Sequence, residues 1–91
     1  MIDVKQASKL AIEYFTTLFE NKYSNLTLEE VEVSGDGKYW YITLGYDIDK
    51  PFSVTLPLRK TGREYKRFKI DVESGKVLSM QIRKPDQIQN F

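Results

Sequence analysis

The sequence predicts an α+β fold in which one N-terminal helix packs on one face of a four- to five-stranded antiparallel meander sheet. Two patterns lead to this prediction: an apolar stripe at helical spacing over residues 4–20, and alternating apolar and polar residues in several later segments. The 91 residues, 41% of them hydrophobic, suit a single modest core. We therefore expect one domain over residues 1–84 and a C-terminal tail over residues 85–91.

The first segment has the features of a helix over residues 4–20. Asp3 stands at the N-cap position and Gln6 follows three residues later, as in a capping box. At about 100° per residue one face collects apolar side chains, and we expect this face to lie on the sheet. Its members are Val4, Ala7, Leu10, Ala11, Tyr14, Phe15 and Leu18, with Ile12 and Phe19 on the flank. Asn21 is expected to end the helix in the left-handed conformation.

The next two strands are expected over residues 26–34 and 39–46, joined by a turn at residues 35–38. In the first of them the apolar positions change parity, which predicts either a β-bulge near Glu29-Glu30 or strand pairing that begins only after these residues. The second is the strongest strand signal in the chain, with Trp40, Ile42, Leu44 and Tyr46 on the side that should face the helix. We expect Trp40 to be the leading core residue.

A hairpin is expected over residues 65–83, around the turn at Ser74-Gly75. Its core-facing positions should be Phe68, Ile70, Val72, Leu78, Met80 and Ile82. The segment before it, residues 47–64, is irregular. There Phe52, Val54, Leu56 and Leu58 alternate with polar residues and with a proline that only an edge position tolerates. This segment is therefore either a fifth, outer strand or a projecting arm.

Charge is unevenly distributed although the net charge is only +1. Residues 1–49 hold four basic and nine acidic side chains, net −5, and residues 50–91 hold ten basic and four acidic, net +6. This balance argues against a general polyanion binder. Two arrangements remain open: a dipole, if the halves form opposite edges of the sheet, or cross-strand ion pairing, if their strands interleave.

The composition offers little catalytic chemistry, because the chain has no cysteine and no histidine. Among the carboxylates, only Glu30 and Glu32 of the acidic run should share a strand face, and such a pair is typical of a solvated edge. Asp47 and Asp49 offer too few oxygen ligands for a metal ion. We expect no enzyme activity, no metal and no cofactor.

The sequence also gives little indication of where the protein acts. Residues 1–15 lack a secretory signal pattern and no apolar run is long enough to span a membrane. We expect a cytoplasmic protein, or an extracytoplasmic one if the sequence is a trimmed piece.

Several of these segments together resemble the PepSY and PepSY-like domains. The resemblance rests on Tyr14-Phe15, on the strand pair 31–33 and 40–42, and above all on the hairpin from Tyr65 to Arg83. It implies a cystatin-like helix on an antiparallel sheet, and a protein-binding or protease-restraining module rather than an enzyme. Members of this family mostly act outside the cytoplasm. Residues 31–35 lack the glutamine of the cystatin inhibitory loop, and residues 47–64 fit the family pattern least.

The sheet face away from the helix is the candidate binding surface. Its predicted partner-binding residues are Tyr39, Tyr41, Tyr65, Arg67, Lys69 and Arg83, because tyrosine and arginine are favoured in protein-binding hot spots. Phe52, Val54 and Leu56 form a second candidate, an edge or arm that binds a partner or a second copy of the chain. The alternative function is binding of single-stranded nucleic acid on the same face. The simplest alternative is an ordinary surface on which long side chains cover the sheet.

Overall fold

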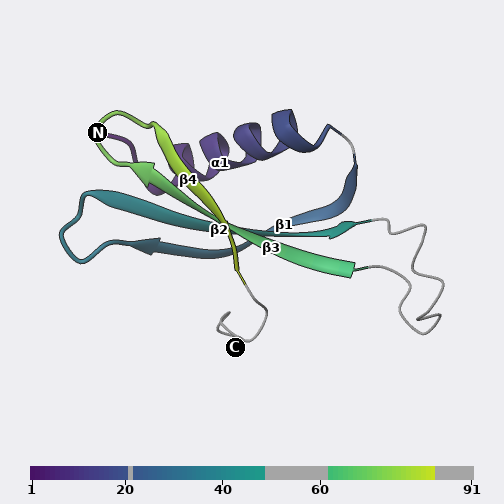
Figure 1. The fold of residues 1–91 in the computed structure, drawn as a ribbon. Coiled ribbons are helices and arrows are strands. Elements are labelled where there is room, and N and C mark those ends of the chain that lie inside the picture. Colours follow the sequence, from purple (N-terminus) through teal and green to yellow (C-terminus); the bar gives the residue numbers. More distant parts are fainter. Residues whose placement is uncertain (21, 49–61, 84–91) are drawn as a thin grey trace.

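The computed structural model describes residues 1–20, 22–48 and 62–83, and it contains one helix and four strands in these ranges (Figure 1). The elements are α1 (Val4–Phe19), β1 (Tyr23–Val33), β2 (Tyr39–Ile48), β3 (Gly62–Asp71) and β4 (Val77–Ile82). The strands form one antiparallel sheet in the order β1-β2-β3-β4, and α1 lies along one of its faces. The predicted α+β class is therefore confirmed. Phe52, Val54, Leu56 and Leu58 lie outside the described residues.

The start of α1 forms the predicted capping box. The backbone N–H of Gln6 donates to Asp3 Oδ1 at 2.8 Å, and the backbone N–H of Asp3 donates to Gln6 Oε1 at 3.0 Å. The end of the helix differs from the prediction. Glu20 is the left-handed C-cap residue, with φ 48°, and its N–H closes the last turn on the carbonyl of Thr16. The helix thus ends at Phe19, one residue earlier than predicted, and Asn21 lies outside the described residues.

The buried face of α1 is turned slightly from the predicted stripe. Ala7, Ala11 and Phe15 are fully buried, and Leu10, Ile12 and Phe19 pack against the core. Val4 and Leu18 were expected on this face but are 40% and 50% exposed, and Tyr14 is 42% exposed although its ring contacts Phe68 edge-on at 6.0 Å. The reason is an aromatic cluster: the Phe15 ring stacks on Phe19 at 4.3 Å and contacts Tyr46 at 4.5 Å, which brings the Phe19 side of the helix onto the sheet.

The sheet contributes most of the core from its two central strands. The fully buried side chains facing α1 are Ile42, Leu44, Tyr46, Phe68 and Ile70, as predicted, and Val72 is 7% exposed. Trp40 was predicted to lead the core, but it is only half-buried. It lies at the end of the sheet where the chain enters α1, and its indole Nε1 donates to the carbonyl of Ile2 at 3.1 Å. It closes the core at one end rather than filling its centre.

The predicted bulge in β1 is confirmed. Leu28 pairs with Leu44 and Glu30 with Thr43, so Glu29 is an extra residue without a partner of its own in β2. A further irregularity lies between Ser24 and Thr27, which the sequence pattern did not predict. Asn25, inside it, has a positive φ of 53°.

A bulge at the start of β4 makes one core assignment wrong. Lys69 pairs with Ser79 and Ile70 with Val77, so Leu78 is the extra residue. Val77 therefore packs against the core, while Leu78 is 49% exposed. Met80 packs against the core as predicted, but Ile82 is 73% exposed near the end of the strand. Within the described ranges, no helix has the length and apolar character needed to cross a membrane.

Candidate functional site

The sheet face away from α1 brings together the residues that sequence reasoning selected. The register places Tyr41, Lys69 and Ser79 in one row across β2, β3 and β4. Thr43, Arg67 and Gln81 form the next row. We call this side of the sheet the open face.

The open face is hollowed over β2, β3 and β4. The hollow has a volume of about 480 Å³ and is lined by Tyr41, Arg67, Lys69, Leu78, Ser79 and Gln81. Three of the six predicted partner-binding residues line it, whereas Tyr39, Tyr65 and Arg83 do not. Leu78 was missed, because it was assigned to the core. The adjacent apolar pair Val77-Leu78 was the one signal that the parity changes there.

Two cations of the hollow lie over tyrosine rings. Arg67 Cζ is 4.3 Å from the centroid of the Tyr41 ring, and Lys69 Nζ is 4.2 Å from that of Tyr39. Such contacts hold the charged groups in place without neutralising them. Arg67 Nη2 also lies 3.4 Å from Glu32 Oε1, whose side chain is 68% exposed. No carboxylate of the described residues lies within ion-pair distance of Lys69.

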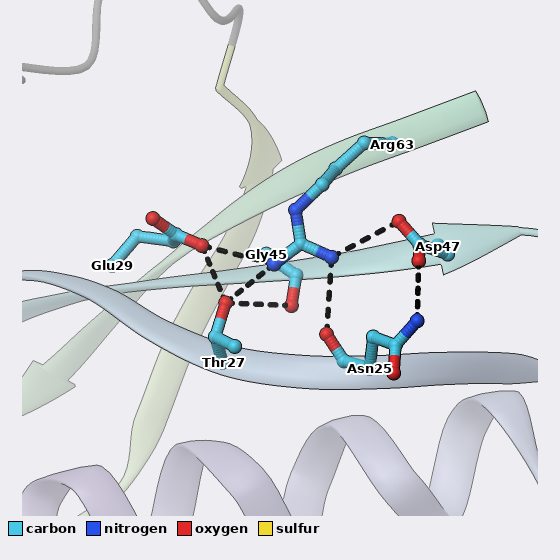
Figure 2. Close-up of polar contacts among 6 residues, drawn as sticks. All are labelled: Asn25, Thr27, Glu29, Gly45, Asp47 and Arg63. Carbon is cyan, nitrogen blue, oxygen red and sulfur yellow. Dashed lines mark hydrogen bonds and ion pairs between the residues drawn. The ribbon is translucent and has the colours of Figure 1, made fainter. Parts of the chain in front are cut away.

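Further along β3, Arg63 is held in a polar network that reaches across β2 to β1 (Figure 2). Its Nη1 donates to Asp47 Oδ1 and to the carbonyl of Asn25, both at 3.0 Å. Its Nη2 donates to Glu29 Oε2 at 3.0 Å and to the hydroxyl of Thr27. The Nη1 and Nη2 atoms of Arg63 therefore each donate to two acceptors.

The network lies directly over Gly45, at a position where a side chain would not fit. A Cβ atom there would lie 2.6 Å from Glu29 Oε2, 2.9 Å from Glu29 Cγ and 2.9 Å from Tyr65 Cε1. The absence of a side chain lets the Glu29 carboxylate lie directly on the strand.

Hydrogen bonds keep the acids of this network ionised. The Thr27 hydroxyl, and then Arg63, hold the pKa of the Glu29 carboxyl below its ordinary value. The Asn25 amide, and then Arg63, likewise lower the pKa of Asp47. The network is a satisfied ion-pair cluster rather than an acid–base pair, because both carboxylates prefer to stay charged near Arg63.

A second ion pair crosses the sheet. Arg83, directly after β4, donates from Nε to Glu30 Oε1 of β1 at 3.1 Å. The same oxygen accepts from the hydroxyl of Thr43, which is only 1% exposed in the middle of the open face. β4 runs at a steep angle to β1, and this strong twist brings the two outer strands within reach of each other (Figure 1).

The acidic run of β1 faces the same way as these cations. Its side chains Glu29, Glu30 and Glu32 all contact arginines of the open face, whereas only Glu30 and Glu32 were expected to share a side. The bulge explains the difference, because it turns Glu29 to the same side as its neighbours. The acidic first half and the basic second half of the chain therefore form ion pairs across the sheet.

The geometry defines an α+β domain whose open face carries a cationic and aromatic hollow. In the described part of the chain, no cluster of three or more side chains is placed to hold a metal ion. No protein-family model, curated protein or solved structure matches the chain. The resemblance to PepSY domains therefore stays a prediction.

Proposed function

We propose that this protein is a non-catalytic interaction domain that binds a protein partner through the hollow of the open face. The observation that carries the proposal is the lining of the hollow. The ring of Tyr41 and the exposed side chain of Leu78 offer apolar contact, and Arg67 and Lys69 offer charged donors beside them. Aromatic and arginine side chains in a concave patch are typical of binding hot spots.

The resemblance to PepSY domains supports the same class of function, because it implies a protein-binding or protease-restraining module. The interaction that we propose is therefore either binding or inhibition of a protein partner. The second predicted surface, Phe52, Val54 and Leu56, lies outside the described residues and stays a prediction.

Single-stranded nucleic acid is the alternative ligand, and the charges of the open face argue against it. Arg63 and Arg83 are already paired with carboxylates of the same face. A chain of phosphates would have to pass these acids or displace them, at an electrostatic cost. A protein partner needs only a local match of charge and shape.

The proposal is tested by affinity capture from host lysate with wild-type protein and a Tyr41→Ala/Arg67→Glu variant. A matched control, Leu18→Ala/Lys9→Glu, removes an exposed apolar group and reverses a charge on the helix side. All three proteins should first show the same circular dichroism spectrum and similar unfolding midpoints in urea. Capture is then compared at low and moderate salt, with and without nuclease, and bound proteins are identified by mass spectrometry.

We expect one or a few proteins to be retained by the wild type and by the helix-side control, and lost with the open-face variant, despite nuclease. Retention that disappears on nuclease treatment would replace the proposal with the nucleic-acid alternative. Equal retention by all three proteins would show that the open face is ordinary surface.

A further inference from the structure

We infer that the hollow binds a short, extended acidic segment of the partner, with two carboxylates at alternate positions and an apolar side chain next to them. This inference rests on the proposed function, since it names the chemistry of the partner at the same face. Three features of the hollow support it: the spacing of the two cations, their availability and the position of Leu78.

The spacing of the two cations matches that of an extended peptide. Arg67 and Lys69 are two residues apart on β3, and both side chains line the hollow. Alternate residues of a strand repeat at about 6.8 Å, and alternate side chains of an extended ligand repeat at the same distance. One carboxylate can therefore lie at each cation when the ligand runs along β3.

Of the cations on the open face, Arg67 and Lys69 can most readily take up a carboxylate from a ligand. The arginines outside the hollow pair with carboxylates whose side chains are well covered: Asp47 is 18% and Glu30 is 21% exposed. The acid next to Arg67 is Glu32, at 3.4 Å and 68% exposed, and a contact with such an exposed acid contributes little. An incoming carboxylate can replace Glu32 at small cost, whereas Arg63 and Arg83 would have to leave better partners.

The apolar position of the ligand follows from the bulge in β4. Leu78 enters the hollow because it is the extra residue between Val77 and Ser79, and its side chain is half exposed there. It lies beyond Lys69 along β3, since Lys69 pairs with Ser79. Leu78 lies at a level between Lys69 and Ile70, so an apolar side chain that follows the second carboxylate on the same face of the ligand can reach it.

The charges around the hollow limit the ligand to a short acidic segment. Asp71 follows Lys69 on the same side of β3, and Arg67 is followed in the other direction by the network in which Arg63 is paired with acids. A longer polyanion would meet carboxylates or neutralised arginines at both ends. This favours a peptide with a few acidic residues over a nucleic-acid strand.

The test is an NMR titration of ¹⁵N-labelled protein with the blocked peptide acetyl-Gly-Glu-Ser-Glu-Ser-Leu-Gly-amide. The control peptide has glutamine in place of both glutamates, and a short oligothymidylate is the nucleic-acid probe. Two protein variants carry the same loss of charge: Arg67→Gln/Lys69→Gln in the hollow and Lys5→Gln/Lys9→Gln on the exposed side of α1. The dispersion of the amide spectrum reports whether each variant is folded.

We expect the acidic peptide to shift the amide signals of residues 67–69 and 78–79, and the glutamine peptide to leave them in place. Loss of two charge-assisted contacts should weaken binding about tenfold or more in the hollow variant. The helix variant should stay within about twofold of wild type, because its lysines lie on the other side of the sheet.

Three results would overturn the inference: no binding of the acidic peptide, an equal loss in both variants, or tighter binding of the oligonucleotide at the same residues. The first of these leaves the proposed function intact if lysate capture still depends on Tyr41 and Arg67. In that case a protein partner uses the hollow through other chemistry. If capture is also independent of these residues, the proposed function fails with the inference.

Discussion

Replacing Gly45 by alanine provides a sharp test of the packing on the open face, because two effects of opposite sign compete there. Glycine in a strand interior is ordinarily less stable than alanine, by about 0.5–1 kcal/mol. Gly45 has no positive φ that would exclude a side chain. If the space above it were free, Gly45→Ala would therefore stabilise the protein.

The space above Gly45 is filled, however. A Cβ atom would lie 2.6 Å from Glu29 Oε2 and 2.9 Å from both Glu29 Cγ and Tyr65 Cε1. Overpacking of this kind costs about 1–3 kcal/mol. Glu29 can yield only by leaving Arg63, a contact of 3.0 Å between side chains that are about 30% exposed, which adds about 0.5 kcal/mol. After subtraction of the gain in backbone entropy, we expect Gly45→Ala to lower the free energy of unfolding by about 0.5–3 kcal/mol.

The assay is urea unfolding followed by the fluorescence of Trp40, the single tryptophan. Gly35→Ala is the matched control, since no atom lies within 4 Å of a Cβ there and its effect should be small. In a Glu29→Ala background the cost of Gly45→Ala should fall by about 0.5–1.5 kcal/mol, because only the Tyr65 contact is left. A Gly45→Ala protein as stable as wild type, or a cost unchanged by Glu29→Ala, would refute the reasoning.

Two further predictions concern ionisation. The carboxyl pKa values of Glu29 and Asp47 are lowered from 4.5 and 3.8, so their stabilising effect should be complete above those values and lost as the pH falls through the lowered ones. Urea unfolding between neutral and acidic pH should show a smaller acid loss for Arg63→Met than for wild type, and equal losses would contradict the network. Burial, and then the nearby Glu64, raises the pKa of Tyr46, whose hydroxyl donates to Glu64 Oε1 at 3.3 Å. In an alkaline absorbance titration Tyr46 should therefore ionise above the ordinary tyrosine value of about 10, and Tyr46→Phe should remove absorbance change only above that pH; a loss of absorbance change at or below pH 10 would contradict the raised pKa.

The fold could be predicted because local patterns and global structure agree in most of the chain. Strict alternation placed Ile42 and Leu44 on the core side, and the parity change in β1 located the bulge at Glu29. The signal for the bulge in β4 was weaker, because Val77 and Leu78 are both apolar and either suits a core position. Trp40 was misplaced for another reason: periodicity gives the face of a residue but not its distance from the end of the sheet.

The candidate site was predicted in part. Tyr41, Arg67 and Lys69 share a face because strands alternate, and this much follows from the sequence. Which cations are already paired does not follow, because Arg63 and Arg83 contact acids of β1 across the intervening strands. Such contacts depend on strand order and on the twist of the sheet, which no local pattern contains.

The Glu30–Arg83 ion pair has a consequence for how the sheet opens. β1 and β4 are its outer strands, each hydrogen-bonded to a neighbour on one side in the described sheet. Outer strands of this kind ordinarily fray independently of each other. Here a carboxylate of β1 binds the residue that follows β4, above the buried hydroxyl of Thr43. Detachment of either outer strand therefore breaks a contact made by the other, so this ion pair couples the opening of the two edges of the sheet.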